Sequence, residues 1–198
     1  MAPHDVPSPS EAPIINILGE KVALGPLLRE HLPLNLRWLN DFEVLATTSA
    51  VRPLTPDQLE TEYERGLAAK DQVHFTIYER TTLRPIGGAN LHDIDTRTAT
   101  FAILIGEKDC WGKGYGTEAT RLVLDYGFSA LGLHNIVLTV HSSNARGLRA
   151  YQRAGFREIG RRREVINRGG RLYDLVYMDC LASEFQGPSV LRQLWSGA

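Results

Sequence analysis

Hydrophobic and polar residues repeat with two different periods along this chain, and the periods predict where strands and helices lie. Apolar runs that alternate with polar residues, or run on for several positions between turn residues, are typical of strands. These runs cover residues 21–27, 73–80, 85–94, 98–106 and 135–141, and a pair over 156–182 joined by a turn at 167–171. Apolar residues three and four positions apart are typical of helices, and they cover 29–47, 55–70, 117–132 and 145–155.

Capping residues and prolines define the predicted helix boundaries more closely. Thr55 can cap a helix in which Pro56 takes the first position, and Gln58 completes a capping box. The first helical segment is broken near Pro33 and Asn40, which predicts two short helices there.

The order of the elements predicts one α+β domain with a mixed, mostly antiparallel sheet flanked by helices. We expect this domain to span residues 14–183, after a flexible Pro- and Ser-rich tail over 1–13. An extension over 184–198 holds an amphipathic segment with Leu191, Leu194 and Trp195. That segment docks either on the body of the domain or on a partner.

Composition and charge exclude several classes of protein. The chain has 198 residues and a net charge of −1, so no basic field points to nucleic acid. No apolar run reaches the roughly 18 residues of a membrane helix, and the N-terminus lacks the features of a secretory signal. The two cysteines, Cys110 and Cys180, are isolated, which suits a reducing compartment. We therefore expect a cytoplasmic protein that binds neither nucleic acid nor membrane, and a homodimer stays open.

Glycines at 112, 114 and 116 lie between a predicted strand and a predicted helix. A Walker A loop is excluded, because Lys113 is followed by Gly114 instead of Ser or Thr. A dinucleotide fingerprint is excluded too, because its third glycine falls on Thr117 and the next strand ends without a carboxylate. The spacing instead favours a pyrophosphate held without metal by amides at a helix start, with Lys113 as an added charge.

Two stretches of sequence carry a likeness to a known family. The stretch IGEKDCWGKGYGTEATRLVLDYGF resembles the acetyl-CoA loop and following helix of the GNAT N-acetyltransferase superfamily, whose Gln/Arg-x-x-Gly-x-Gly/Ala pattern falls on Trp111, Gly114 and Gly116. About thirty residues later, Asn144, Tyr151 and the pair Gly155-Phe156 match a second family motif. The Trp-Gly-Lys-Gly form looks like the branch of ribosomal-protein-alanine N-acetyltransferases. The resemblance covers roughly residues 20–182.

The resemblance implies a sheet that is split between the strand ending near Ile105 and the strand over 136–140, so that acetyl-CoA can enter. It also implies the cofactor contacts, which are backbone groups of Ile103, Leu104 and Ile105 for the pantetheine arm and the loop residues Trp111, Gly112, Lys113, Gly114, Tyr115, Gly116 and Thr117 for the pyrophosphate. Asn144 is expected either to bond the cofactor arm or to cap the next helix. Tyr151 is expected to protonate the departing thiolate, or else to be a core aromatic residue.

The general base is less clear from the sequence. Relatives commonly place a Glu where this chain has Thr100, which cannot act as a base. His92, beside Asp93, and Glu107 are the nearby candidates, and an ordered water chain is an equal alternative. The resemblance thus implies direct transfer of an acetyl group from acetyl-CoA to a primary amine of a small molecule or a protein N-terminus, and the loop spacing predicts that no metal is needed. The alternative is a non-catalytic acyl-CoA-binding sensor on the same fold.

Overall fold

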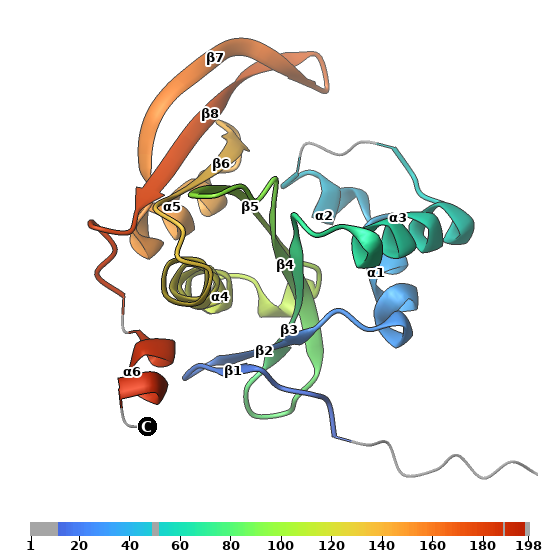
Figure 1. The fold of residues 1–198 in the computed structure, drawn as a ribbon. Coiled ribbons are helices and arrows are strands. Elements are labelled where there is room, and N and C mark those ends of the chain that lie inside the picture. Colours follow the sequence, from blue (N-terminus) through green and yellow to red (C-terminus); the bar gives the residue numbers. More distant parts are fainter. Residues whose placement is uncertain (1–11, 49–51, 188, 197–198) are drawn as a thin grey trace, which may run out of the picture.

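An eight-stranded sheet organises the chain in the order β1-β2-β3-β4-β5-β6-β8-β7 (Figure 1). This computed structural model describes residues 12–48, 52–187 and 189–196, so most of the predicted N-terminal tail lies outside the described residues. The strands are β1 (Ile17–Leu18), β2 (Val22–Pro26), β3 (Val73–Glu79), β4 (Pro85–His92), β5 (Thr98–Ile105), β6 (Asn135–His141), β7 (Arg157–Arg168) and β8 (Arg171–Leu181). Every neighbouring pair is antiparallel except β5 and β6, which confirms the mixed, mostly antiparallel sheet.

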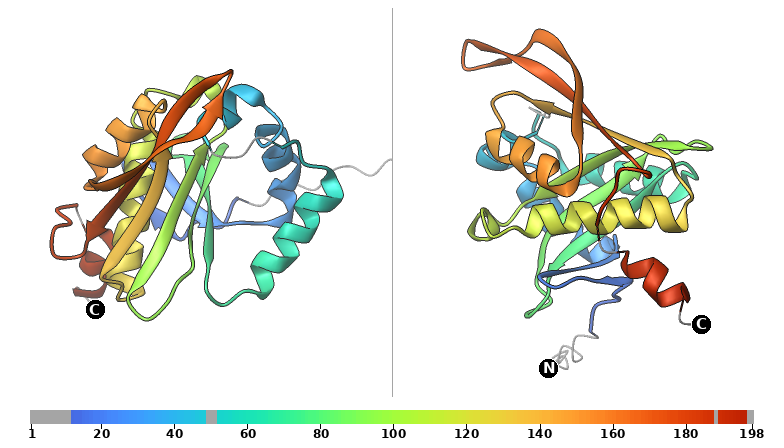
Figure 2. Two further views of the ribbon diagram at one scale, coloured as in Figure 1. Left: turned by 90° about the horizontal axis from the view of Figure 1, so that it is seen from above. Right: turned by 90° about the vertical axis from the view of Figure 1, so that its left-hand side faces the viewer.

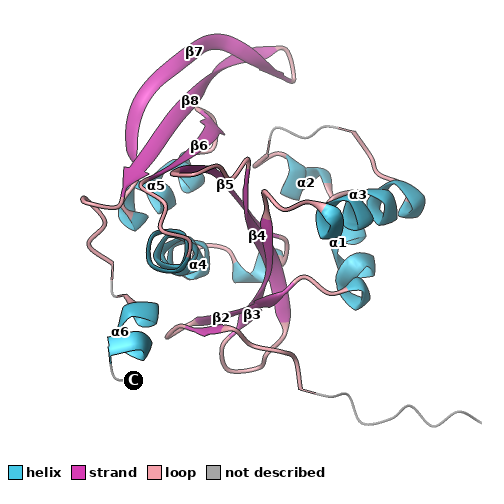
Figure 3. Cartoon of the chain, viewed as in Figure 1, coloured by secondary structure: helices cyan, strands magenta, loops and turns pink. Residues whose placement is uncertain are grey.

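Helices cover both faces of this sheet (Figures 2 and 3). On one face lie α4 (Tyr115–Asp125), which continues into a π-helical turn (Tyr126–Ala130), and α5 (Ala145–Ala154). On the other face lie α1 (Leu32–Trp38), α2 (Phe42–Leu45) and α3 (Pro56–Ala68). Short 3₁₀ turns at Arg29–His31 and Lys108–Cys110 and a last helix, α6 (Val190–Ser196), complete the described elements.

Most of the helix boundaries that the sequence predicts are seen in the structure. The Thr55 hydroxyl accepts from the Gln58 amide at 3.3 Å, and the Gln58 side chain accepts from the Thr55 amide at 2.9 Å, so the capping box is confirmed. The two short helices that were predicted are α1 and α2, and they are separated at Asn40 as expected. Pro33 does not break a helix, because it lies in the first turn of α1, where the missing amide proton costs nothing. The two-residue strand β1 was not predicted, since it is too short to show a period.

The helix α4 forms the centre of the core. Val123 and Leu124 are fully buried on it, and it ends at Asp125, a buried carboxylate. Asp125 accepts hydrogen bonds from the hydroxyls of Ser129 and Ser189 at 2.9 and 2.6 Å and from the Leu191 amide at 3.0 Å. These bonds dock α6 on the body of the domain, where Leu191 is buried. Of the two alternatives that the sequence left open, the structure therefore shows the C-terminal segment docked on the body of the domain.

The sheet opens between its two central parallel strands. The ladder between β5 and β6 consists of the pairs Thr98–Asn135, Ala99–Ile136 and Thr100–Val137. Beyond these pairs β5 runs on to Ile105 along β4, while β6 runs on to His141 along β8. The predicted split is thus confirmed, and it separates the C-terminal halves of β5 and β6.

Candidate active site

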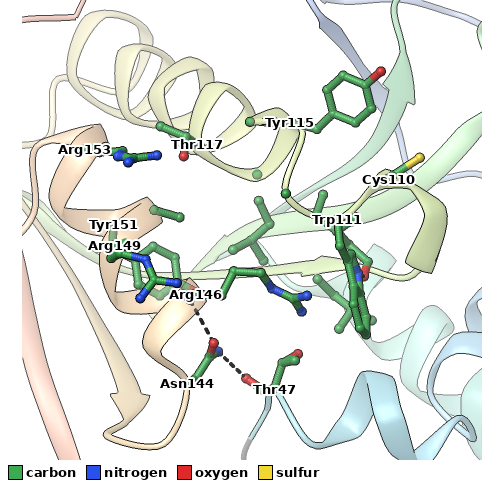
Figure 4. Close-up of a pocket in the computed structure, with 18 residues that line it drawn as sticks. Thr47, Cys110, Trp111, Tyr115, Thr117, Asn144, Arg146, Arg149, Tyr151 and Arg153 are labelled. Atoms are coloured by element: carbon green, nitrogen blue, oxygen red, sulfur yellow. Dashed lines mark hydrogen bonds between the residues drawn. The ribbon is translucent and has the colours of Figure 1, made fainter.

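A cavity of about 280 Å³ lies where β5, the loop before α4 and the helix α5 meet (Figure 4). It occupies the α4–α5 face of the split sheet. Its lining residues are Thr47, Ile103, Leu104, Ile105, Cys110, Trp111, Gly112, Gly114, Tyr115, Gly116, Thr117, Asn144, Arg146, Gly147, Arg149, Ala150, Tyr151 and Arg153. The structure therefore brings together every residue predicted for the cofactor except Lys113. The Lys113 side chain does not line the cavity, and its carbonyl oxygen lies 3.4 Å from the Lys21 ammonium.

The loop needs glycine at two positions. Gly112 and Gly114 adopt φ angles of +78° and +89°, in the left-handed region that other residues rarely enter. Gly114 is also the N-cap of α4, so the chain turns there from the loop into the helix. Gly116 is an ordinary helical residue, and an added side chain would make normal contact with Ile105. The first helical turn of α4 therefore faces the cavity with its free amides.

Three arginines on α5 form the opposite wall. Arg146, Arg149 and Arg153 are spaced three and four residues apart, which places them on one face of the helix. The described residues that line the cavity include no Asp or Glu, so this wall is positively charged and has no carboxylate partner among them. These arginines were missed from the sequence, although their spacing along an amphipathic helix was a usable signal.

Arg146 closes the cavity toward the loop. Its guanidinium lies 3.8 Å from the centroid of the Trp111 ring, a cation–π contact visible in Figure 4. The Trp111 indole is itself fixed by donating to the Ile105 carbonyl at 2.8 Å. Partial burial lowers the pKa of Arg146, yet an arginine stays charged at any physiological pH. The stack therefore holds a cation between the loop and α5.

Tyr151 lies on α5 at the inner end of the cavity. Its ring packs edge-on against Phe101 and Phe156, with centroids 6.4 and 6.1 Å away. Burial raises the pKa of Tyr151 to about 12, so the phenol keeps its proton at neutral pH. Its hydroxyl forms no hydrogen bond with another residue of the described chain. Tyr151 is thus both an aromatic packing residue and a free proton donor at the cavity wall.

Asn144 has a structural task that the sequence left open. Its side-chain oxygen accepts from the Gly147 amide at 2.8 Å, which confirms the N-cap of α5. Its amide nitrogen donates to the Thr47 carbonyl at 2.9 Å (Figure 4). Thr47 follows α2 on the other face of the sheet, so this contact links the two faces. No feature of the sequence pointed to Thr47.

The structure does not bring Glu107 or His92 to the cavity. The Glu107 carboxylate is paired with Arg37 and accepts from the Trp38 indole at 2.8 Å, because the 3₁₀ turn that follows β5 directs it toward α1. His92 ends β4 opposite Thr100, and its Nδ1 lies 2.9 Å from an oxygen of the Asp93 carboxylate. About a third of the His92 side chain is exposed, on the face of the sheet away from α4.

Cys110 lies at the edge of the cavity and is almost fully buried. Burial raises the pKa of this thiol, which keeps it protonated and unreactive. Among the described residues, no three His, Cys, Asp or Glu side chains gather where they could hold a metal ion. The described helices are also too short or too polar to cross a membrane.

Comparisons with known proteins agree with this geometry. Residues 21–157 match the acetyltransferase (GNAT) domain. The chain is 30% identical to human alpha/beta-tubulin-N-acetyltransferase 9 over 159 residues, which are 72% of this chain and 75% of that protein. It is 37% identical to the probable N-acetyltransferase YjcK of Bacillus subtilis over 113 residues, 56% of this chain and 62% of that protein. A solved spermidine N-acetyltransferase from Vibrio cholerae, in complex with CoA and spermine, superposes with a TM-score of 0.79 at 26% identity, covering 85% of this chain and all of that one.

Proposed function

This chain belongs to the acetyltransferase (GNAT) family, and from that premise we propose that it moves an acetyl group directly from acetyl-CoA to a primary amine, without metal or covalent intermediate. Family membership makes it an acyl-CoA-dependent acetyltransferase that acetylates amines, with acetyl-CoA as the cosubstrate. Our proposal adds which residues of the chain bind the cosubstrate and which transfer protons.

The unneutralised arginine wall is the observation that carries the proposal. As far as its lining is described, the cavity has three arginines and no carboxylate, which suits a molecule with several negative charges. The same cavity is bordered by the N-terminus of α4, which suits a pyrophosphate, and by the edge of β5, which suits an arm that contains amide groups. CoA has these groups joined in one molecule, so the lining fits it. The loop 111–117 would hold the pyrophosphate, and backbone groups of Ile103 to Ile105 would pair with the arm.

The reaction requires one bond to form and one to break. The amine nitrogen attacks the thioester carbonyl carbon, a C–N bond forms, and the C–S bond breaks. Tyr151 donates the proton that the leaving thiolate needs, because its hydroxyl is protonated and free of other partners. Asn144 supports this step indirectly, by capping the helix that carries Tyr151.

The proton released by the amine goes to His92 in this proposal. Glu107 is the weaker candidate, because its carboxylate is already held by Arg37 and Trp38. His92 lies on the opposite face from Tyr151, one strand away from Thr100, and it accepts the proton through a bridging water. The pairing with Asp93 orients its ring.

The acceptor is proposed to be a small amine or a protein N-terminus. Relatives named for tubulin and for spermidine support both kinds of acceptor. The non-catalytic sensor is not favoured, because these relatives are named as enzymes. The narrower likeness to ribosomal-protein-alanine N-acetyltransferases, the homodimer and the cytoplasmic location stay predictions.

Release of free thiol from acetyl-CoA tests the proposal. The assay would use spermidine, an aminoglycoside and a peptide with an N-terminal alanine as acceptors, with a reaction lacking acceptor as the control for hydrolysis. We expect acceptor-dependent release, and a gain of one acetyl group on the acceptor by mass spectrometry. Binding of acetyl-CoA without release toward any amine would refute catalysis and favour the sensor.

A further inference from the structure

Asn90 on β4 has a buried side-chain oxygen with no hydrogen-bond partner in the described structure. A buried amide oxygen without a partner is costly, so such an atom calls for an explanation. Asn90 lies two residues before the end of β4, which runs between β3 and β5. A molecule that brings an N–H group to this atom would supply the missing donor.

The position of Asn90 is set by its neighbours in the sheet. Its cross-strand partners are His74 on β3 and Ala102 on β5, and cross-strand partners share a face. The alternate residues Ala89 and Leu91 are buried in the core beneath α4, so Asn90 faces the side of α1–α3. His92, two residues further on, faces the same side.

Asn90 and Tyr151 flank the same point of β5 from opposite faces. Tyr151 packs on Phe101, whereas Asn90 pairs with the next residue, Ala102. Both residues of β5 lie just beyond Thr100, where the ladder to β6 ends and the sheet opens. Ala102 is exposed, so the face that carries Asn90 is accessible at the opening. A molecule that approaches from this face meets Asn90 about one strand spacing, roughly 5 Å, from the opening.

The carboxylates around this face are already engaged. The Asp93 carboxylate contacts His92, Glu107 is paired with Arg37, and Asp179 accepts from the Asn135 amide at 3.1 Å. Asp41 and Glu43, near the end of α1, both contact Lys108. In the part of the chain that the structure describes, the Asn90 side-chain oxygen is therefore an acceptor on this face that no other residue occupies.

We propose that Asn90 binds the acceptor amine, with its side-chain oxygen accepting a hydrogen bond from the amino group that attacks the thioester. This inference rests on the function proposed above and adds the residue that holds the second substrate. A hydrogen bond from one N–H of a neutral amine to this oxygen orients the amino group and leaves its lone pair free to attack, after which the nitrogen has one proton to release. His92 lies two residues along the strand, about 7 Å away, and can receive that proton through water.

The test compares Asn90→Ala and Asn90→Asp with Asn135→Ala. Asn135 is a matched control, because its side-chain oxygen is also buried without a partner but lies at the closed start of the β5–β6 ladder. We expect Asn90→Ala to raise the KM of the amine that the wild type acetylates by about tenfold to a hundredfold, the effect of losing one buried hydrogen bond. The calorimetric Kd for acetyl-CoA should not change. Asn90→Asp keeps an oxygen in the same place and should stay within a few-fold of the wild type.

Each outcome decides something. An unchanged amine KM in a folded Asn90→Ala protein would overturn the inference, as would an equal rise in Asn135→Ala or a parallel loss of acetyl-CoA affinity. If Asn90→Ala does not fold, the nearly isosteric Asn90→Asp decides, and a loss of amine affinity in it at pH 8 overturns the inference. A wild type that binds acetyl-CoA but acetylates no amine would instead refute the proposed function itself.

Discussion

Replacing Tyr151 by Phe removes one proton and leaves the packing almost intact. The ring would still contact Phe101 and Phe156, and no hydrogen bond within the described structure would be lost. The substitution therefore isolates the chemical role of the hydroxyl from its contribution to the core.

The size of the effect follows from the pKa. Burial raises the pKa of Tyr151 to about 12, whereas a thiol such as that of the leaving group titrates near 8.5. Complete proton transfer from the phenol to the free thiolate is thus uphill by about 3.5 units, or about 5 kcal/mol. The hydroxyl can help only while the C–S bond is breaking, when the sulfur is most basic. General acids contribute about 10²–10⁴ in rate, and an acid this weak belongs at the lower end, so we expect kcat to fall by about a hundredfold.

Steady-state thiol release at saturating acetyl-CoA measures this change, alongside the melting temperature. Tyr126→Phe is a suitable control, because Tyr126 is another tyrosine whose pKa is raised by burial, packed against Phe75 away from the cavity. Its kcat should match the wild type. Full kcat in a folded Tyr151→Phe protein would refute the reasoning and leave the thiolate to depart unaided or through water.

Four further predictions follow from the same structure. Gly114→Val should weaken acetyl-CoA binding at least about tenfold by calorimetry, because a β-branched residue cannot easily hold a φ of +89°, and unchanged affinity would mean that the loop is not the anion site. Arg146→Ala should raise the KM for acetyl-CoA without lowering kcat, and an unchanged KM at low salt would show that the stack on Trp111 is only structural. Asp125→Ala should lower the free energy of unfolding in urea by about 2–4 kcal/mol, since three donors lose a buried acceptor, and a loss below about 1 kcal/mol would contradict the docking of α6. Burial lowers the pKa of His31, so as the pH falls the unfolded chain binds a proton at this side chain, near its ordinary pKa of about 6.5, before the folded chain does. The free energy of unfolding should therefore decrease as the pH drops from 7 toward 5, and His31→Gln should make that decrease smaller.

The features that the sequence predicted well are those in which a residue type has one local physical meaning. Gly112 and Gly114 mark the loop because the left-handed backbone there excludes most other residues. Thr55 and Gln58 mark a helix start because each satisfies the amide of the other. The strands follow from alternation or from short continuous apolar runs between turn residues, since β2 and β3 are buried at consecutive positions whereas β4 alternates.

The features that the sequence did not predict depend on contacts between distant segments. Glu107 looked like a free base, but Arg37, seventy residues earlier in the chain, occupies its carboxylate. The contact of Arg146 with Trp111 was not predicted, because it joins α5 to the loop before α4. Asn90 was not singled out from the sequence, because the lack of a partner for its side-chain oxygen depends on the surrounding tertiary structure. Such pairings are properties of the tertiary structure, and neither local segment identifies the partner.

The split in the sheet also has a consequence for the stability of the folded protein and its lifetime in a cell. Beyond Thr100, the strand β5 has an edge inside the molecule that β6 does not pair with. An arm that bonds to this edge would act as a missing strand, so the cosubstrate would be part of the architecture as well as a reactant. A ligand at a hundred times its Kd stabilises the folded state by about 2.7 kcal/mol. The abundance of the protein would then follow the supply of acetyl-CoA, because chains without ligand unfold more often and are degraded sooner.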